Sequence, residues 1–337
     1  MCGKYPKNYK EKYKELNPEK YRDTIEKVIR KGSTPAGMHI SIMVKEIIDF
    51  LQIKPGQTGF DATLGYGGHT RAMLECLKGQ GHMYATDVDP IESAKTKKRL
   101  AEAGFGEDIL TIKLQNFCTI DEIAKEAGGF DFVLADLGVS SMQIDNPDRG
   151  FSFKVDGPLD LRLNPEKGIS AAERLAGIEE EELAGMLWEN SDEPYAEELA
   201  HAIVTEIKHG KPIETTTRLR EVIEETLSFL PEKERKDTVK KTCQRTFQAL
   251  RIDVNNEFEV LYEFMEKLPG VLKPGGRAAI LTFHSGEDKL VKKALKQGYK
   301  EGIYSEIAND VVRPSAEECA QNGRARSTKM RWAVRAE

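Results

Sequence analysis

An aspartate and a glycine-rich sequence are spaced as in a site for a nucleotide-like ligand. The sequence GYGGH spans residues 65–69, and Asp87 follows Gly65 by 22 residues, at the end of a short apolar run. Glycines between a strand and a helix let the backbone approach a ligand closely, and the helix N-terminus offers N–H groups. An acid at the end of the next strand accepts hydrogen bonds from ribose hydroxyls. This spacing alone suits either NAD or S-adenosylmethionine.

Three details favour S-adenosylmethionine over NAD. Thr70 stands where the dinucleotide pattern GxGxxG has its third glycine. Asp61 lies four residues before Gly65, where methyltransferases commonly carry an acid that serves the cationic, amino-acid end of the cofactor. Residues 272–277 read LKPGGR, a frequent turn before a late strand of class I methyltransferases. We therefore expect a methyltransferase, and an NAD-dependent dehydrogenase is the distant alternative.

Polar residues also follow the fourth apolar run of the sequence; they are Asp136, Ser140, Ser141, Gln143 and Asp145. Ligands of open α/β sheets bind beyond the carboxyl ends of the strands, so these residues should border the site. The Asn/Asp-Pro-Pro-aromatic sequence that amino-methylating DNA enzymes often carry here is absent. Asp136 is still able to accept hydrogen bonds from an exocyclic amine and so leave the nitrogen lone pair facing the methyl group.

Strand and helix patterns alternate along the first part of the chain. The predicted strands span residues 59–64, 82–87, 109–114 and 130–137, and the predicted helices 42–51, 70–77, 90–100 and 120–127. This order predicts an α/β fold, a mainly parallel sheet with helices on both faces, as in the Rossmann-like class I methyltransferases. The alternation lapses over residues 147–240, which look largely helical. It resumes with an amphipathic helix at 258–268 and a strand at 278–283.

We therefore expect a catalytic domain interrupted by a helical insertion rather than two tandem domains. The predicted methyltransferase domain consists of residues 38–146 and 242–337. Residues 147–241 form the helical insertion, which we expect to recognise the substrate. Residues 1–37 form a basic N-terminal extension.

The composition excludes several classes of protein. The 337 residues are 39% hydrophobic and 31% charged, which rules out disorder of the whole chain. No stretch approaches about 18 consecutive apolar residues, so no membrane span is expected. The five cysteines and six histidines are scattered and give no CxxC, HxxxH or HExxH pattern, so neither a disulfide framework nor a metal site has support. A reduced, cytoplasmic protein without a metal is expected.

Charge is distributed unevenly along the chain. The formal net charge is −6, which argues against a general nucleic-acid coat protein. Residues 1–36, 234–251 and 313–337 are nevertheless basic, with net charges of +5, +4 and +3, whereas residues 179–206 carry −10. Such runs are usually solvated faces, and the alternative is that the basic segments converge on a polyanion.

Longer motifs give the sequence a family resemblance that covers residues 38–337. The motifs are MHI (38–40), DATLGYGGH (61–69), DVDP (87–90), QNF (115–117), DLGVSSMQID (136–145), RGFSF (149–153), GPLDLR (157–162), TFQALRI (246–252), VN (254–255), FHS (283–285), ED (287–288) and RARS (324–327). On these motifs the chain resembles the ribosomal RNA small subunit methyltransferase H family, also called MraW. The resemblance implies methyl transfer from S-adenosylmethionine to N4 of a cytidine in the decoding centre of 16S rRNA. The partner it implies is the small ribosomal subunit.

The resemblance also assigns roles to single residues. The implied cofactor contacts are Gly67, Gly68, His69, Asp87, Phe117, Asp136 and Gln143. For catalysis we expect Asp136 to accept the N4–H bond, with Asp160 and His284 as second-rank candidates. The candidate phosphate partners are Arg149, Arg162, Arg245 and Arg251. Phe151 and Phe153 either stack on a splayed base or pack in the core, and core packing is the favoured role.

The sequence departs from the family pattern at three places. The family's His-Ser-Leu-Glu-Asp-Arg reads HSGEDK at residues 284–289, and its Tyr-Gly-Glu-Glu reads NSDE at 190–193, followed by acidic rather than basic residues. The N-terminal extension is longer than usual in the family. Two alternatives therefore stay open, methylation of another RNA or amine, and a cofactor-binding RNA-association factor without turnover. The sequence also leaves open whether the chain forms a homodimer.

Overall fold

The computed structural model describes residues 41–337. The expected basic extension, residues 1–37, lies outside the described residues. The chain divides into two compact units, one made of the residues up to Gly138 together with Glu259–Glu337, and one made of Val139–Phe258. In the described part of the chain, no helix is both long and apolar enough to cross a membrane.

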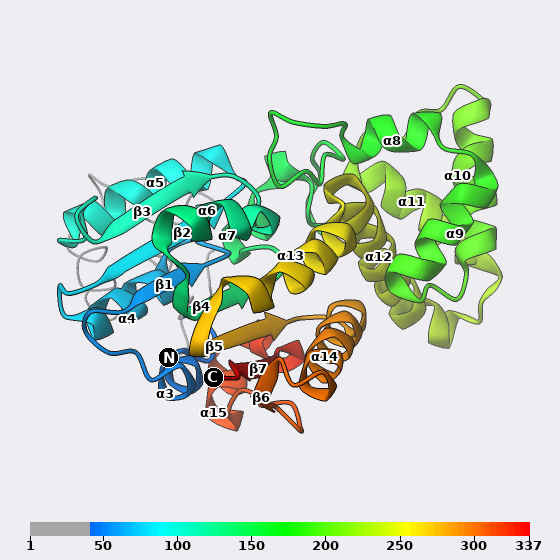
Figure 1. Cartoon of the computed structure of the whole chain (residues 1–337). Coiled ribbons are helices and arrows are strands. Elements are labelled where there is room, and N and C mark those ends of the chain that lie inside the picture. The colour runs from blue at the N-terminus through cyan, green and yellow to red at the C-terminus, as the bar shows by residue number, and fades with distance from the viewer. Residues whose placement is uncertain (1–40) are drawn as a thin grey trace. The chain divides into compact units, whose positions relative to one another are not determined.

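A seven-stranded sheet forms the centre of the first unit (Figure 1). Its strands are β1 (Thr58–Asp61), β2 (His82–Asp87), β3 (Leu110–Leu114), β4 (Phe130–Asp136), β5 (Leu272–Thr282), β6 (Tyr304–Ile307) and β7 (Lys329–Arg335). In the order β3-β2-β1-β4-β5-β7-β6, the first five strands are parallel, and β7 runs antiparallel to both of its neighbours. The predicted α/β fold with a mainly parallel sheet is confirmed.

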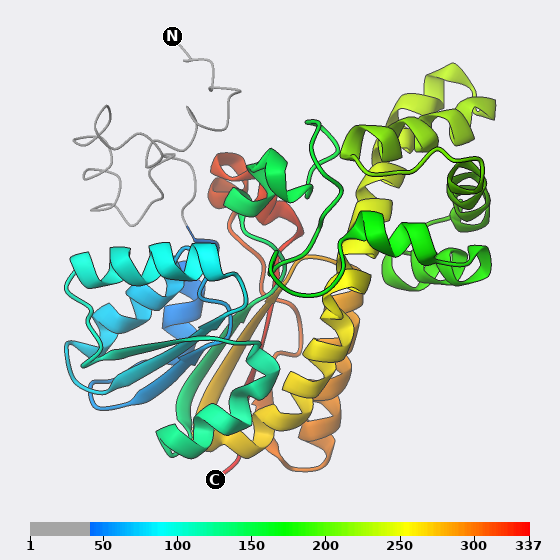
Figure 2. The ribbon, with the colours of Figure 1, turned by 90° about the horizontal axis from the view of Figure 1, so that it is seen from above.

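Helices cover both faces of this sheet. They are α3 (Val44–Leu51), α4 (Gly68–Leu77), α5 (Pro90–Glu102), α6 (Ile120–Ala127), α13 (Glu257–Val271), α14 (Ser285–Lys300) and α15 (Ala316–Gln321). Helices α3, α4 and α5 share a buried cluster with Phe132 and Leu134 of β4, whereas α6, α13 and α14 share another with Val133 and Ala135. Because side chains alternate across a strand, β4 supplies both clusters. Figure 2 shows the sheet between the two helix layers.

The sequence LKPGGR lies within β5 rather than in a turn before it. Strand β5 begins at Leu272, which pairs with Phe130, and the next pair joins Arg277 to Phe132. The residues between these pairs bulge out of the ladder, and Gly275 takes a φ of 73° there. A bulge with a left-handed glycine is compatible with a strand, which corrects the predicted start of this strand at residue 278.

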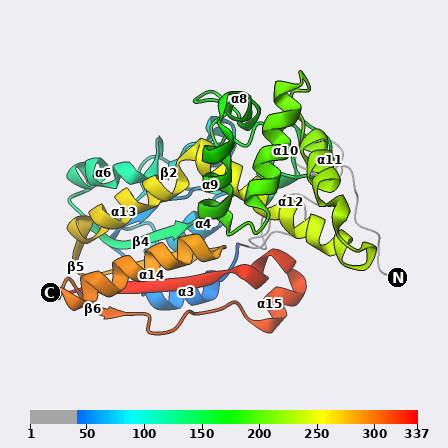
Figure 3. The same cartoon turned by 90° about the vertical axis from the view of Figure 1, so that its right-hand side faces the viewer.

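The second unit is helical. Its α-helices are α7 (Ser141–Asp145), α8 (Ala171–Gly177), α9 (Glu180–Ser191), α10 (Ala196–Lys208), α11 (Thr216–Thr226) and α12 (Glu232–Asn255). Leu187, Leu199 and Leu250 belong to its buried core, and they come from α9, α10 and α12. Figure 3 shows these helices from the side.

This unit is wider than the insertion expected at residues 147–241. It reaches back to Val139 and forward to Phe258. Helix α12 runs unbroken past residue 241, because no glycine or proline interrupts the sequence of Glu232–Asn255.

Candidate active site

Three aspartates lie at the carboxyl ends of neighbouring strands in the first unit. Asp61, Asp87 and Asp136 are the last residues of β1, β2 and β4. The order β2-β1-β4-β5 makes these strands neighbours, and His284 follows β5 at the same edge. The fold thus brings these four residues, which lie up to 223 positions apart in the sequence, to one edge of the sheet.

The glycine-rich sequence forms a tight loop between β1 and α4. Gly65 donates its N–H to Asp87 Oδ2 at 2.8 Å, and the Thr96 hydroxyl donates to the Gly65 carbonyl at 2.6 Å. Gly67 has a φ of 84°, and a Cβ there would lie 2.7 Å from Thr96 Cγ2. A Cβ on Gly68 would lie 2.0 Å from Ser41 Oγ. Glycine is required at Gly67 by its left-handed backbone and by Thr96, and at Gly68 it lets the Ser41 side chain pack directly against the loop.

Asp87 is held by backbone N–H groups on both carboxylate oxygens. Its Oδ2 accepts the bond from Gly65, and its Oδ1 accepts the N–H of Asp89 at 2.9 Å. Burial raises the pKa of Asp87 to about 6, although these two bonds oppose the shift. Each oxygen keeps further lone pairs, which is compatible with the predicted contact to ribose hydroxyls, and that contact stays a prediction.

Asp61 serves the protein itself rather than the charged end of a cofactor. It is 0% exposed, its Oδ2 accepts the Thr70 hydroxyl at 2.6 Å, and its Oδ1 accepts the Thr63 N–H at 3.0 Å. The Thr63 hydroxyl in turn accepts the backbone N–H of Asp136 at 2.7 Å. The sequence interpretation of Asp61 is therefore corrected, because the carboxylate ties the glycine loop to β1 and β4. Thr63 and Thr70 are the residues that sequence reasoning missed.

Asp136 pairs with His69. His69 is 7% exposed, its Nε2 lies 2.9 Å from the Ile42 carbonyl, and its Nδ1 lies 3.4 Å from Asp136 Oδ2. The pKa of Asp136 is raised to about 6, mainly by burial and also by the charges of Asp61 and Glu287, while His69 opposes the shift. Within residues 41–337 no group donates a hydrogen bond to Asp136 Oδ1, which is buried. A buried acceptor without a donor is unusual in a folded protein and marks Asp136 as a candidate functional residue.

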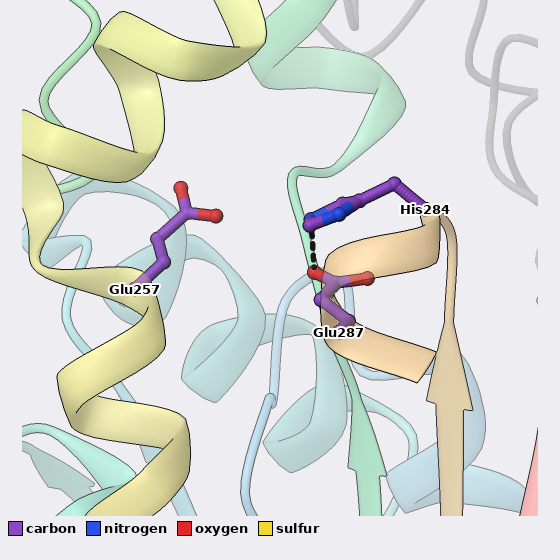
Figure 4. A group of neighbouring side chains, drawn as sticks. All are labelled: Glu257, His284 and Glu287. Atoms are coloured by element: carbon purple, nitrogen blue, oxygen red, sulfur yellow. Dashed lines mark ion pairs between the residues drawn. The ribbon is translucent and has the colours of Figure 1, made fainter. Parts of the chain in front are cut away.

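His284 pairs with a glutamate that sequence reasoning did not single out. Its Nε2 lies 3.2 Å from Glu287 Oε1, as the dashed line in Figure 4 marks. Glu287 is 3% exposed, and its Oε2 accepts the Phe283 N–H at 2.8 Å. The sequence signal for this pair is the separation of three residues between His284 and Glu287 at the start of α14. That separation places both side chains on one helical turn. The pair fixes the imidazole at the carboxyl end of β5.

Phe117 begins the short helix that follows β3, η2 (Phe117–Thr119). Its ring is half-buried and packs against the ring of Phe264 in a T-shaped arrangement, with the ring centroids 5.2 Å apart. This contact holds an aromatic surface after β3, at the edge where β2 ends in Asp87. The position is compatible with the predicted contact to an adenine, which stays a prediction.

In the second unit, three predicted site residues build local structure. Gln143 Oε1 accepts the Ser140 N–H at 2.9 Å, and Ser140 Oγ accepts the Gln143 N–H at 3.2 Å, which forms a capping box for α7. Asp160 receives a two-pronged bond from Arg162, whose Nε lies 2.7 Å from Asp160 Oδ1 and whose second nitrogen lies 2.8 Å from Oδ2. Arg162 also donates to the Gly168 carbonyl. The Asp160–Arg162 pair therefore stabilises the loop at residues 160–168, and the two charged groups are hydrogen-bonded to each other.

Two of the other candidate phosphate partners are also engaged within the second unit. Arg149 is 7% exposed and donates to the carbonyls of Arg162 and Leu163. Arg251 donates to both oxygens of Glu257, at 2.8 and 2.9 Å. The side chain of Arg245, by contrast, is 40% exposed, and Glu193 lies 3.9 Å away.

Phe151 and Phe153 pack against the helical core of the second unit, as the favoured interpretation had it. The Phe153 ring lies 5.7 Å from the ring of Phe247 on α12. This contact belongs to core packing rather than to a stacking platform.

Comparisons with known proteins agree along nearly the whole chain. The profile of the MraW methylase family matches residues 36–336. The chain is 85% identical over 335 residues to "Ribosomal RNA small subunit methyltransferase H 1" of Agathobacter rectalis, covering 99% of this chain and 96% of the relative. It is 72% identical to the protein of the same name in Lachnoclostridium phytofermentans, covering 99% and 91%. It is 63% identical to "Ribosomal RNA small subunit methyltransferase H 2" of Alkaliphilus metalliredigens, covering 99% and 96%. The N-terminal extension and the acidic insertion therefore have counterparts in these relatives.

Proposed function

The chain belongs to the MraW methylase family, and on that premise we propose that it transfers a methyl group from S-adenosylmethionine to N4 of a cytidine in 16S rRNA. The observation that carries the proposal is the carboxylate of Asp136 at the end of β4, whose buried Oδ1 receives no bond from the described residues. The relatives lend no support to the dehydrogenase, to a different amine or RNA, or to a factor without turnover.

The residues of the first unit fit the cofactor. The glycine loop lies directly before the N-terminus of α4, where free backbone N–H groups suit the anionic carboxylate of the cofactor's amino-acid end. Asp87 stands beside this loop with lone pairs for the ribose hydroxyls. When bound, S-adenosylmethionine supplies a methyl carbon that is electrophilic because it is attached to a sulfonium.

Asp136 supplies the polar contact that a cytosine amine requires. The lone pair of N4 is delocalised into the ring, so the nitrogen becomes a nucleophile only when it pyramidalises. An acceptor at Asp136 Oδ1 holds one N4–H bond and favours this geometry, which aligns the lone pair for an in-line displacement. The N–H proton becomes acidic as the new bond forms, and the carboxylate is placed to receive it.

Phosphate contacts are best supported on helix α12. Three of the four predicted arginines are engaged in ion pairs or carbonyl bonds, and Arg245 is the exposed one. The exposed residues of α12 at helical spacing around it carry four positive and two negative charges; they are Lys233, Glu234, Lys236, Asp237, Lys240, Lys241 and Gln244. The opposite side of the helix is buried in the core of the unit. We therefore assign the RNA backbone to this side of α12, which we name the α12 basic face.

A salt titration tests the α12 basic face. The double variant Lys240→Gln/Lys241→Gln should bind rRNA fragments more weakly, and its slope of log affinity against log salt should be smaller by about 1.4, since each lost contact removes about 0.7. The matched control is Lys292→Gln/Lys293→Gln, which removes two exposed lysines of α14. Equal slopes for both double variants would contradict the assignment.

The reaction itself is tested with small ribosomal subunits that lack N4-methylcytidine. Protein and S-adenosylmethionine are added, and the nucleosides are analysed by mass spectrometry. New N4-methylcytidine supports the proposal, and its absence while the cofactor binds contradicts it. We further propose that the protein acts in the cytoplasm, where small subunits are found, and that copies of the chain pair as a homodimer, which light scattering tests.

A further inference from the structure

The orientation of His69 is fixed by its surroundings. Its Nε2 faces the Ile42 carbonyl at 2.9 Å, and a carbonyl only accepts, so Nε2 carries a hydrogen. In the neutral ring, Nδ1 then has a lone pair and no hydrogen. That lone pair faces Asp136 Oδ2 at 3.4 Å. The geometry leaves one place for one additional proton, between the imidazole and the carboxylate.

His69 and Asp136 come from different elements of the first unit. His69 is the second residue of α4, and Asp136 ends β4. The other charged groups that act on Asp136 are Asp61 of β1 and Glu287 of α14, and both favour a protonated Asp136. A carboxyl group that takes up a proton here lies beside the ring nitrogen Nδ1 of His69.

The two oxygens of Asp136 differ in their surroundings. Oδ2 faces His69, whereas Oδ1 is buried and receives no bond from the described residues. The backbone N–H of Asp136 is held by the Thr63 hydroxyl, so the strand end that carries the side chain is fixed too. An amine that binds at Oδ1 therefore meets a carboxylate whose other oxygen already has a neighbour able to take a proton.

We propose that His69 is a positioning residue of the methyl transfer: it accepts, at Nδ1, the hydrogen of the carboxyl group that forms at Asp136 and so holds that group in place. This inference rests on the proposed function. The N–C bond forms as the S–C bond breaks, and the methylated nitrogen passes one proton to the carboxylate. The carboxyl group then turns about its Cβ–Cγ bond and directs its O–H at His69 Nδ1. The sulfonium charge is lost with the methyl group, and the proton is held by the pair until it reaches solvent.

The pH dependence of the single-turnover rate, at saturating cofactor, separates this role from a merely structural one. His69→Gln keeps an N–H for the Ile42 carbonyl but removes the Nδ1 acceptor. We expect a rate at least tenfold lower at pH 7.5. We also expect the acid limb of the profile to move from its wild-type position near pH 6, because the variant lacks the ring nitrogen that faces the Asp136 carboxyl group. An even loss of rate with an unmoved acid limb would overturn the inference.

Nitrogen NMR of the histidines gives a readout that is independent of turnover. The expected spectrum shows His69 with its hydrogen on Nε2 at pH 8, and a titration of Nδ1 that changes in Asp136→Asn. A neutral His69 with its hydrogen on Nδ1 would overturn the inference. The matched control is His82→Gln, which removes the histidine bonded to the Thr111 hydroxyl at the start of β2 and should keep the wild-type pH profile. Wild-type protein that makes no N4-methylcytidine refutes the proposed function, whereas wild-type turnover with an unchanged His69→Gln acid limb refutes only this inference.

Discussion

Replacing Thr70 by valine removes one of the short hydrogen bonds that support the glycine loop. The Thr70 hydroxyl lies 2.6 Å from Asp61 Oδ2, and both residues are 0% exposed. Valine has the same shape, so the variant loses the bond and little packing. A hydrogen bond to a charged group contributes about 1.5–3 kcal/mol, and we expect the free energy of unfolding to fall by that amount at pH 8.

The loss should depend on pH. Burial raises the pKa of Asp61 above its usual range, and the Thr70 hydroxyl opposes this shift. Without the Thr70 hydroxyl the pKa of Asp61 rises further. The folded variant is therefore less stable than the wild type when Asp61 is ionised. This difference is present at high pH and disappears as pH falls and Asp61 takes up a proton. The destabilisation measured at pH 5 should therefore be smaller than that at pH 8.

A second buried threonine of the same unit provides the control. The Thr86 hydroxyl donates to the Ala62 carbonyl at 2.9 Å, a neutral acceptor, and Thr86 is also 0% exposed. Thr86→Val should cost about 1 kcal/mol at both pH values. Urea unfolding followed by circular dichroism measures both variants. Equal losses for the two, or a Thr70→Val loss that does not change with pH, would refute the role given to Asp61.

Three further predictions concern the same edge of the sheet. The methyl-transfer rate of the wild type should fall as pH drops through about 6, because a protonated Asp136 no longer receives the proton of the amine; a flat profile from pH 8 to 5 would count against this. Gly67→Ala should lose about 1–2 kcal/mol from its left-handed backbone and weaken cofactor binding in calorimetry, since its Cβ meets Thr96. Gly104→Ala, with a φ of 92° and open space around it, should lose stability and keep its cofactor affinity. Glu287→Gln should move the acid limb of the rate below about 6, because the charge of Glu287 raises the pKa of Asp136; an unmoved limb would show that the two carboxylates do not interact.

Much of the sheet could be predicted because its central strands carry continuous apolar runs. Strands β1 and β4 are largely buried on both faces, and β1, β2 and β4 each end in an aspartate, which the sequence displays directly. Strand β7 was missed because its sequence KMRWAVR alternates charged and apolar residues near the chain end. Strand β6 is short, with only Tyr304 fully buried, so it has little pattern to detect.

The candidate site could be predicted in part. The glycine loop and the strand-end acids follow from local spacing, and the structure brings Asp87, Asp136 and His284 to one edge. The partner of each side chain could not be predicted, because it depends on contacts between distant segments. Asp61 is an example, since its burial and its bond to Thr70 turn an apparent ligand group into a support of the loop. The arginines of the second unit are another, because their carbonyl and carboxylate partners are visible only in the folded chain.

The central claim is that Asp136 positions N4 of a cytidine for methylation. The most direct measurement compares wild type with Asp136→Asn on small subunits that lack the modification, with the methylated nucleotide mapped by mass spectrometry and cofactor affinity measured alongside. We predict N4-methylcytidine at one decoding-centre position for the wild type, and at least a hundredfold slower formation for Asp136→Asn with its cofactor affinity kept. Equal rates for the two proteins, or methylation at an atom other than N4, would contradict the account.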